Sequence, residues 1–149
     1  MDIVVAAVGR MKTGPTRTLW DDYTKRITWP LTLREVEEKR PLSSAELKAR
    51  EGELLKKAIP ERAWLVCMDA GGKSLDSKAF ATKMNEWQEH GPIAFLIGGA
   101  DGLDGSLLKQ ASFTLSLSAM TWPHMLARTM LIEQIYRAQC ILTNHPYHR

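Results

Sequence analysis

The chain has 149 residues, about the length of one domain, which is enough to bury a core without disulfides or a structural metal. Its apolar fraction of 44% and charged fraction of 25% exclude a disordered or fibrous chain, and no apolar run is long enough for a membrane-spanning helix. The formal net charge of +3 is too small to indicate a partner by itself.

Ten secondary-structure elements are expected, because short β-branched apolar runs alternate with segments of helical apolar spacing. In chain order they are a strand at 3–8, a helix over about 16–29, a strand at 31–36, a helix opened by the capping box Ser43–Glu46 and closed by Pro60, a strand at 63–68, a helix over 77–90, a strand at 93–97, a helix over 103–111, a strand at 114–117 and a helix from Pro123 through Leu142. This alternation predicts a three-layer α/β fold with a largely parallel sheet. No linker or repeat divides residues 1–149, so a single domain is expected.

Two features of the sequence indicate where the protein works. Cys67 and Cys140 lie in apolar stretches, which is typical of buried thiols in a reducing compartment. The apolar run 3–8 is short and follows an acid, the reverse of the charge order in a secretory signal. We therefore expect a cytoplasmic protein with no membrane association.

Three loops follow strands at the edge of the predicted sheet where open parallel sheets bind ligands. They are residues 69–72, 98–102 and 118–123. Glycines in the first two allow close backbone approach to a ligand and positive φ angles, and Gly71–Lys73 is expected to form a turn. The loop 98–102 matches neither the phosphate loop nor the dinucleotide fingerprint, which argues against ATP hydrolysis and nicotinamide chemistry. Tight turns that only connect strands would explain the same glycines.

Other catalytic chemistries find little support. The histidines of the C-terminal third are not joined by a carboxylate or thiol at a ligand spacing, so no metal site is predicted. Ser118 lacks the elbow motif of serine hydrolases, and Cys67 lies in mid-strand, where thiols are usually inert. Met120 and Trp122 are consistent with an apolar pocket for a flat ring and equally with core packing.

The C-terminal third is unusual in its charge. Residues 105–149 contain four Lys or Arg residues and a single acid, Glu133. The chain ends in Tyr147, His148 and Arg149, groups that can stack on a base or bind a phosphate. Such a region fits a polyanion, although scattered solubility charges and an unremarkable polar terminus explain the composition equally well.

Four segments of the second half carry specific motifs. They are residues 96–103 (LIGGADGL), 117–124 (LSAMTWPH), 136–138 (YRA) and 143–149 (TNHPYHR). Together they resemble the RlmH family of bacterial SPOUT-class methyltransferases, and the resemblance extends over essentially the whole chain. Members of that family transfer a methyl group from S-adenosylmethionine to N3 of a pseudouridine in 23S ribosomal RNA. The resemblance therefore implies this activity, this cofactor, and 23S rRNA in the large subunit or the assembled ribosome as partner.

The resemblance also implies features that composition and spacing do not show. A C-terminal trefoil knot would involve the loops around Gly98–Gly99 and 118–123, with the last helix threaded through. The family is homodimeric, has its cofactor pocket at the subunit interface and needs no metal. The residues that match its cofactor site are Met68, Gly98, Gly99, Leu117, Ser118, Ala119, Met120, Thr121 and Trp122. Leu is common in the family at the positions of Met120 and Trp122.

The implied reaction requires removal of the N3 proton and stabilisation of the resulting anion. We expect His148 to act as the base or to orient the target base, since its unperturbed pKa of ~6.5 leaves it mostly neutral at pH 7. Tyr147 would stack on the target base and Arg149 would bind a phosphate, and Glu133 is the competing proton acceptor. The alternative function is a non-catalytic RNA-binding or ribosome-associated protein that keeps the fold and has lost the cofactor pocket.

Overall fold

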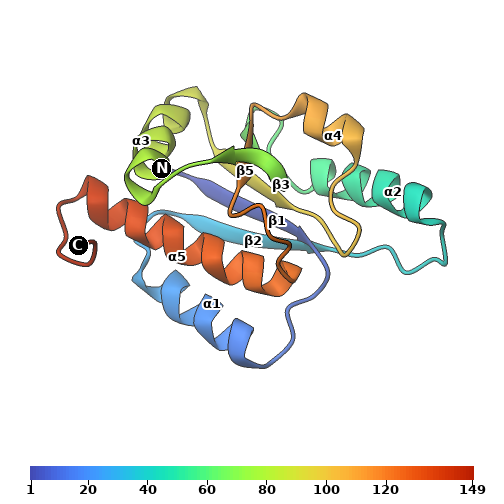
Figure 1. The fold of residues 1–149 in the computed structure, drawn as a ribbon, viewed down its shortest axis with the longest axis horizontal. Coiled ribbons are helices and arrows are strands. Elements are labelled where there is room, and N and C mark those ends of the chain that lie inside the picture. Colours follow the sequence, from blue (N-terminus) through green and yellow to red (C-terminus); the bar gives the residue numbers. More distant parts are fainter.

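The structure is a computed structural model that describes all 149 residues (Figure 1). Its elements, in chain order, are β1 (Ile3–Val8), α1 (Pro15–Arg26), β2 (Leu31–Val36), α2 (Ser44–Lys57), β3 (Trp64–Ser74), α3 (Ser77–Trp87), the short 3-10 helix η1 (Gln88–His90), β4 (Ile93–Ile97), α4 (Gly105–Gln110), β5 (Phe113–Ser116) and α5 (His124–Leu142). Every element expected from the sequence is present, in the expected order. None of the helices combines the length and apolarity that crossing a bilayer requires.

All strand pairs are parallel, and the strands follow the order β2-β1-β4-β3-β5 across one sheet. β1 is buried on both faces because its side chains alternate between two cores. Ile3, Val5 and Ala7 pack with α1, α3 and α5, whereas Ala6 and Val8 pack with α2 and α4. Helices therefore cover both faces of the sheet (Figure 1). This arrangement confirms the predicted three-layer α/β fold.

The second half of β3 differs from the prediction. The turn expected at Gly71–Lys73 is wrong, because pairing with β5 resumes at Lys73 after a bulge that starts at Met68. A Cβ atom on Gly72 would lie 2.6 Å from the carbonyl oxygen of Thr114, so this glycine permits close contact between strands. The bulge displaces the intervening residues from the ladder at the carboxyl edge of the sheet, the edge where the strands end.

Several helices are shorter than predicted: α3 ends at Trp87 and is followed by η1, α4 spans only Gly105–Gln110, and α1 and α5 differ for reasons that the structure shows. α1 ends at Arg26, short of the predicted residue 29, because Ile27 is extended and buried. The Thr28 amide then donates to Oε1 of Gln139 on α5 at 2.7 Å, a tertiary bond in place of a helical one. α5 begins at His124 because Pro123 has a ψ angle of 138°, which places it outside the helix as the N-cap.

α5 is the last helix and the longest, and it packs against both α1 and α3. Its first turn lies beside the loops that follow β4 and β5, with which it shares a cavity. The trefoil knot would be built from these same segments, and it stays a prediction from the resemblance.

Candidate active site

A cavity of about 680 Å³ lies at the carboxyl edge of the sheet, within the range of ligand and cofactor pockets. Segments that are far apart in sequence form it: the bulge of β3, the loop after β4, the loop after β5 and the first turn of α5. The predicted cofactor residues that line it are Met68, Gly98, Gly99, Leu117, Ser118, Met120, Thr121 and Trp122. Ala119 is the one predicted member that does not line it. The fold thus brings together the loops that the strand pattern placed at one edge of the sheet, and they carry the residues that the resemblance assigned to the cofactor.

The glycine loop after β4 closes tightly on itself. A Cβ atom on Gly98 would lie 2.6 Å from the carbonyl carbon of Gly102, so no side chain fits at this position. The Gly102 amide donates to the Gly99 carbonyl at 3.0 Å. The positive φ expected in this loop belongs to Gly102, at +79°. The backbone of this loop, with no side chain at three positions, therefore forms one wall of the cavity.

Gly99 has a different reason to be glycine from the one we expected. A Cβ atom there would meet Cγ1 of Val8 at 3.1 Å and Oε2 of Glu51 at 3.3 Å, and neither residue lines the cavity. A side chain at Gly99 would therefore point away from the ligand space, into the packing against β1 and α2. Gly98 is the position at which a side chain would directly distort the cavity wall.

The loop after β5 is shaped by hydrogen bonds. The Ser116 hydroxyl lies 3.0 Å from the carbonyl oxygens of both Ala70 and Ser118, and the Met120 amide donates to Oγ of Ser118 at 3.0 Å. Met120 is 69% exposed and Trp122 is 41% exposed. Core packing is therefore the wrong explanation for these two side chains, and the cavity has apolar groups at its rim that can cover a flat ring.

Two carboxylates in the cavity wall were missed by sequence reasoning. Asp69 lies in the β3 bulge and Asp101 in the glycine loop. Asp69 directly follows the predicted strand 63–68, and Asp101 lies in the loop after the predicted strand 93–97. Their position beyond strands was the signal that could have found them. They supply the negative charge of the cavity wall, which suits a cationic ligand.

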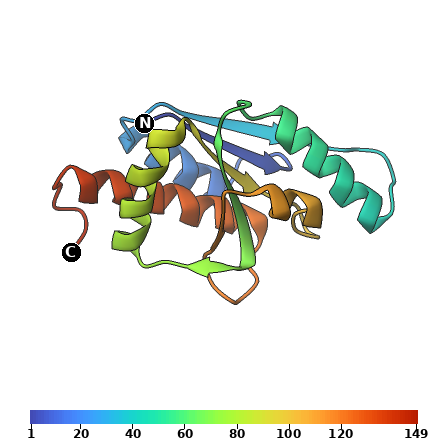
Figure 2. The same ribbon diagram turned by 90° about the horizontal axis from the view of Figure 1, so that it is seen from above.

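The C-terminal tail does not reach this cavity within the chain. It folds back along the C-terminal half of α5, whereas the cavity lies at the N-terminal end of that helix (Figure 2). The Tyr147 hydroxyl donates to Oε1 of Glu133 at 2.9 Å, and its ring packs edge-on against Tyr136 with centroids 4.8 Å apart. Burial, the neighbouring Tyr23 hydroxyl and Glu133 raise the pKa of Tyr147 above its usual range. Tyr147 is thus a docked side chain, and the unremarkable, frayed terminus that the composition allowed is excluded.

His148 is held by a neighbour on α5. Nη1 of Arg137 lies 3.2 Å from Nδ1 of His148, and a guanidinium can only donate, so Nδ1 accepts. The hydrogen of the neutral ring then lies on Nε2. In this arrangement His148 offers a hydrogen-bond donor to an approaching group, which fits the expected orienting role better than the role of base. Arg149 is exposed.

Glu133 is tied into an ion pair, contrary to what a general base needs. Its Oε1 accepts from Nη2 of Arg137 at 2.6 Å and from the Tyr147 hydroxyl, while its Oε2 accepts from Gln134 at 3.0 Å. Both oxygens of this carboxylate are therefore engaged within the chain, which favours a structural role for Glu133 over that of a proton acceptor. Glu133 also borders a second cavity of about 580 Å³, between α1, α3, β5 and α5.

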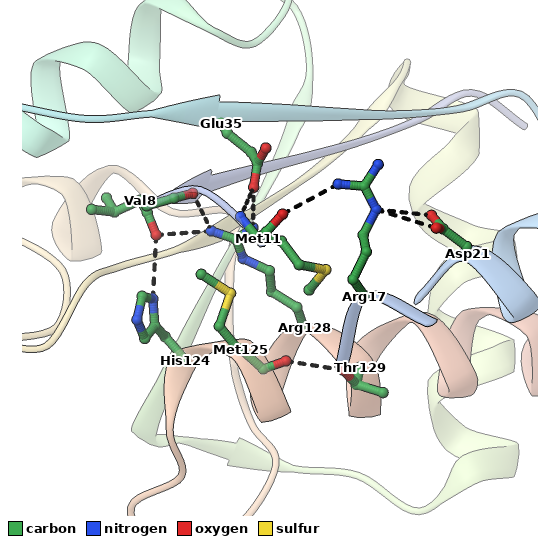
Figure 3. Close-up of polar contacts among 10 residues, drawn as sticks. Val8, Met11, Arg17, Asp21, Glu35, His124, Met125, Arg128 and Thr129 are labelled. Carbon is green, nitrogen blue, oxygen red and sulfur yellow. Dashed lines mark hydrogen bonds and ion pairs between the residues drawn. The ribbon is translucent and has the colours of Figure 1, made fainter. Parts of the chain in front are cut away.

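The cationic excess of the C-terminal third is partly internal. Arg128 is fully buried on α5 and pairs with Glu35 on β2 at 2.6 Å, and Arg137 pairs with Glu133. Figure 3 shows the Arg128 guanidinium directed at the end of β1, where Nη2 donates to the carbonyl oxygens of Val8 and Gly9. Half of the cations that suggested a polyanion surface therefore serve to hold elements of the fold together.

Two further side chains behave as structural groups. Burial raises the pKa of the Cys67 thiol to about 11, so it stays protonated and inert at neutral pH, as expected from its position. His90 stacks on Trp64 with ring centroids 4.4 Å apart. No cluster of three His, Cys, Asp or Glu side chains is placed to hold a metal ion.

Comparison with known proteins places these features in a family. A family model described as "Predicted SPOUT methyltransferase" matches residues 1–148. A protein of Rhodospirillum centenum named ribosomal RNA large subunit methyltransferase H is 50% identical over 151 aligned positions, which cover 100% of this chain and 99% of that protein. A protein of the same name from Gluconacetobacter diazotrophicus is 51% identical, over 96% of this chain and 94% of its own length.

A solved structure agrees at the level of the fold. The structure of a probable methylase family protein from Haemophilus influenzae superimposes with a TM-score of 0.62 at 15% identity, over 99% of this chain and 70% of the other. The fold and the sequence match together define a SPOUT methyltransferase. Within that class, the chain belongs to the family of ribosomal RNA large subunit methyltransferase H, as the resemblance implied.

Proposed function

We propose that this protein transfers a methyl group from S-adenosylmethionine to N3 of a pseudouridine in 23S ribosomal RNA, in the cytoplasm. The observation that carries the proposal is the cavity at the carboxyl edge, because the residues matching the family's cofactor site converge there from β3 and from the loops after β4 and β5. The rRNA part of the proposal is supported by the name that relatives of about 50% identity share.

The residues of the cavity fit S-adenosylmethionine. The exposed rings and chains of Met120 and Trp122 offer apolar cover for an adenine, and the glycine loop exposes backbone amides and carbonyls that can bond polar edges. Asp69 and Asp101 complement a ligand that carries positive charge. When bound, this cofactor supplies an electrophilic methyl group on a sulfonium.

The contributions of the protein itself are positioning, exclusion of water and stabilisation of charge. The rim formed by Met120 and Trp122 excludes water from the cavity mouth. The N3 proton of the pseudouridine passes to solvent water before the base enters the cavity, and a donor such as Nε2 of His148 favours the resulting anion by bonding a carbonyl oxygen next to N3. Arg149 adds a positive charge that holds a phosphate, and no residue of the tail needs to form a covalent intermediate.

We further propose that the tail acts on the cavity of a second subunit. Within one chain, Tyr147 is anchored to the middle of α5 and the cavity lies beside the first turn of that helix. A homodimer in which each tail approaches the partner's cavity would bring together two sets of predicted residues that the single chain keeps apart.

The test is single-turnover transfer of labelled methyl groups to large subunits and to whole ribosomes from cells lacking this protein. Cofactor binding is measured in parallel by calorimetry, and the modified nucleotide is mapped by reverse transcription and mass spectrometry. We expect binding of S-adenosylmethionine and one methyl group per 23S rRNA, on N3 of a pseudouridine. Binding to ribosomes without any cofactor binding would overturn the proposal in favour of the non-catalytic RNA-binding alternative. Transfer to another atom or base would overturn the assigned substrate.

A further inference from the structure

The segment between β1 and α1 carries unneutralised positive charge. Residues 3–20 contain no acid and three cations, Arg10, Lys12 and Arg17. Arg10 and Lys12 are exposed, and only Arg17 has a carboxylate partner, Asp21 at 3.1 Å. We call residues 9–14 the basic segment. Its two exposed cations belong neither to the cavity lining nor to the C-terminal tail.

The basic segment is fixed in place by contacts of Met11, the residue between its two exposed cations (Figure 3). Met11 is only 2% exposed, and its amide donates to Oε2 of Glu35 at 2.6 Å. Its carbonyl oxygen accepts from Nη1 of Arg17 at 3.2 Å. The side chain of Met11 therefore points into the core, and the flanking Arg10 and Lys12 are both directed to solvent.

Arg128 anchors the start of the same segment. It donates to the carbonyl oxygens of Val8 at 2.8 Å and Gly9 at 2.6 Å, and its charge is balanced by Glu35. The backbone of the segment is thus ordered before any partner arrives, so binding through Arg10 and Lys12 costs less conformational entropy. Glu35, the nearest acid in these contacts, is already neutralised by Arg128.

The basic segment lies next to the cofactor cavity. β1 and β4 are neighbours in the sheet, and Ala7 pairs with Ile97, so the two chains leave the sheet at the same edge. His124, which lines the cavity, has Nδ1 3.2 Å from the carbonyl oxygen of Val8. A polyanion whose reacting group enters the cavity would therefore pass close to the two exposed cations.

We propose that Arg10 and Lys12 bind backbone phosphates of the RNA substrate beside the target nucleotide. The proposal rests on the proposed function for the identity of the RNA. Side chains that contact phosphates fix the position of the nucleic acid and add salt-dependent affinity, without reading its sequence. Neither residue touches the reacting atoms, so both act on substrate binding and leave the methyl-transfer step unchanged.

The experiment compares the intact protein with Arg10→Gln/Lys12→Gln. The matched control, Lys57→Gln/Arg62→Gln, removes the same charge from exposed positions without carboxylate partners, near the amino end of β3. Binding to unmodified large ribosomal subunits is measured between about 50 and 200 mM KCl. Loss of two phosphate contacts should reduce the slope of log K against log salt by about 1.4–1.8. KM should rise about tenfold at 50 mM salt and approach the wild-type value at 200 mM, while kcat and cofactor affinity stay unchanged, and the control should match the wild-type protein.

An unchanged slope and KM in Arg10→Gln/Lys12→Gln would overturn the proposal, as would an equal effect in the control. A fall in kcat with unchanged KM would also overturn it, because that result would place the two cations in the chemistry. The outcome is separable from the proposed function. If the wild-type protein transfers no methyl group, the proposed function fails, and the salt slopes for subunit binding still decide whether these cations bind RNA.

Discussion

Arg128 and Glu35 lie 93 residues apart in sequence and form an ion pair of 2.6 Å between α5 and β2. The Arg128 side chain has no exposed surface, whereas that of Glu35 is 25% exposed. Burial lowers the pKa of Arg128 from its usual value and Glu35 opposes that effect, so the guanidinium remains charged at neutral pH. The pair therefore joins α5, which follows the cavity loop, to β2, whose Glu35 also accepts from the Met11 amide of the basic segment.

The first prediction concerns this pair. Glu35→Ala should lower the free energy of unfolding by about 3–5 kcal/mol, because it leaves a buried charge without its partner. Denaturant unfolding at pH 7 measures the change. Glu37→Ala, which removes an exposed carboxylate just after β2, should change it by less than about 0.5 kcal/mol. A loss of similar size in both variants would show that the ion pair contributes nothing specific.

The elements of the fold could be predicted because each has a local cause. The capping box at Ser43 is one example, since Oγ of Ser43 accepts from the Glu46 amide as its spacing indicates. The β3 bulge could not be predicted in the same way. Gly72 has the local signature of a turn, and only the approach of Thr114 on a strand far along the chain keeps it extended. Tertiary contacts decided its conformation.

The second prediction separates the two central glycines of the loop after β4. Gly98→Ala places a Cβ atom 2.6 Å from backbone, so the loop must shift. We expect its affinity for S-adenosylmethionine to fall at least ~100-fold, or ~2.7 kcal/mol. In Gly99→Ala the nearest atoms belong to side chains, at 3.1 and 3.3 Å, and the loss should stay below about tenfold. Gly105→Ala, with open space at its Cβ position, is the neutral control. Calorimetry of the three variants checks this order, and an equal loss in Gly99→Ala would contradict it.

The third prediction is a pH dependence at Glu51. Burial, with a smaller contribution from Asp101, raises the pKa of this carboxyl above 4.5. The folded state therefore holds its proton to a higher pH than the unfolded state, and stability falls as pH rises from 4.5 through the folded pKa. Glu51→Gln should be more stable than the wild-type protein at pH 7 and lose that advantage below pH 4.5. Thermal unfolding across this range measures the difference.

The control for Glu51 is Glu61→Gln, which removes an exposed carboxylate before β3. It should follow the wild-type protein at every pH. If Glu51→Gln showed no gain at pH 7, the carboxylate would have to be better solvated than its 8% exposure indicates.

Only part of the candidate site could be predicted from the sequence. Met120 and Trp122 could be placed in a loop beyond a strand, but their exposure on a cavity rim was a matter of tertiary structure. For Tyr147 the error is different, because a side chain expected to be free to stack on the target base is docked within its own chain. Tyr147 has the appearance of a free group because its partners, Glu133 and Tyr23, are 14 and 124 residues away. Contacts over such separations leave no local signal, so the anchoring of the tail could not be anticipated.

The fourth prediction concerns the individual residues of the tail. Deleting residues 147–149 removes the Tyr147 contacts and should cost stability, so single substitutions are the sharper probes. His148→Ala should lower the single-turnover rate by about 10²–10³-fold, because it removes the donor that favours deprotonation of the target base. Arg149→Ala should mainly weaken ribosome binding and reduce its salt dependence. Cofactor affinity should remain at the wild-type value in both variants.

The last prediction tests whether each tail works on the partner's cavity. Gly98→Ala carries an intact tail with a damaged cavity, and His148→Ala carries an intact cavity with a damaged tail. When the two inactive proteins are mixed and allowed to exchange subunits, a mixed dimer contains one complete site only if the tail crosses between subunits. Random exchange makes half of the dimers mixed, each with one working site of two, so activity should recover to about a quarter of the wild-type level. If the tail served its own cavity, every site would retain one lesion and mixing would restore nothing. Sedimentation of the same samples confirms that dimers are present, so that an absence of recovery would count against the crossed arrangement.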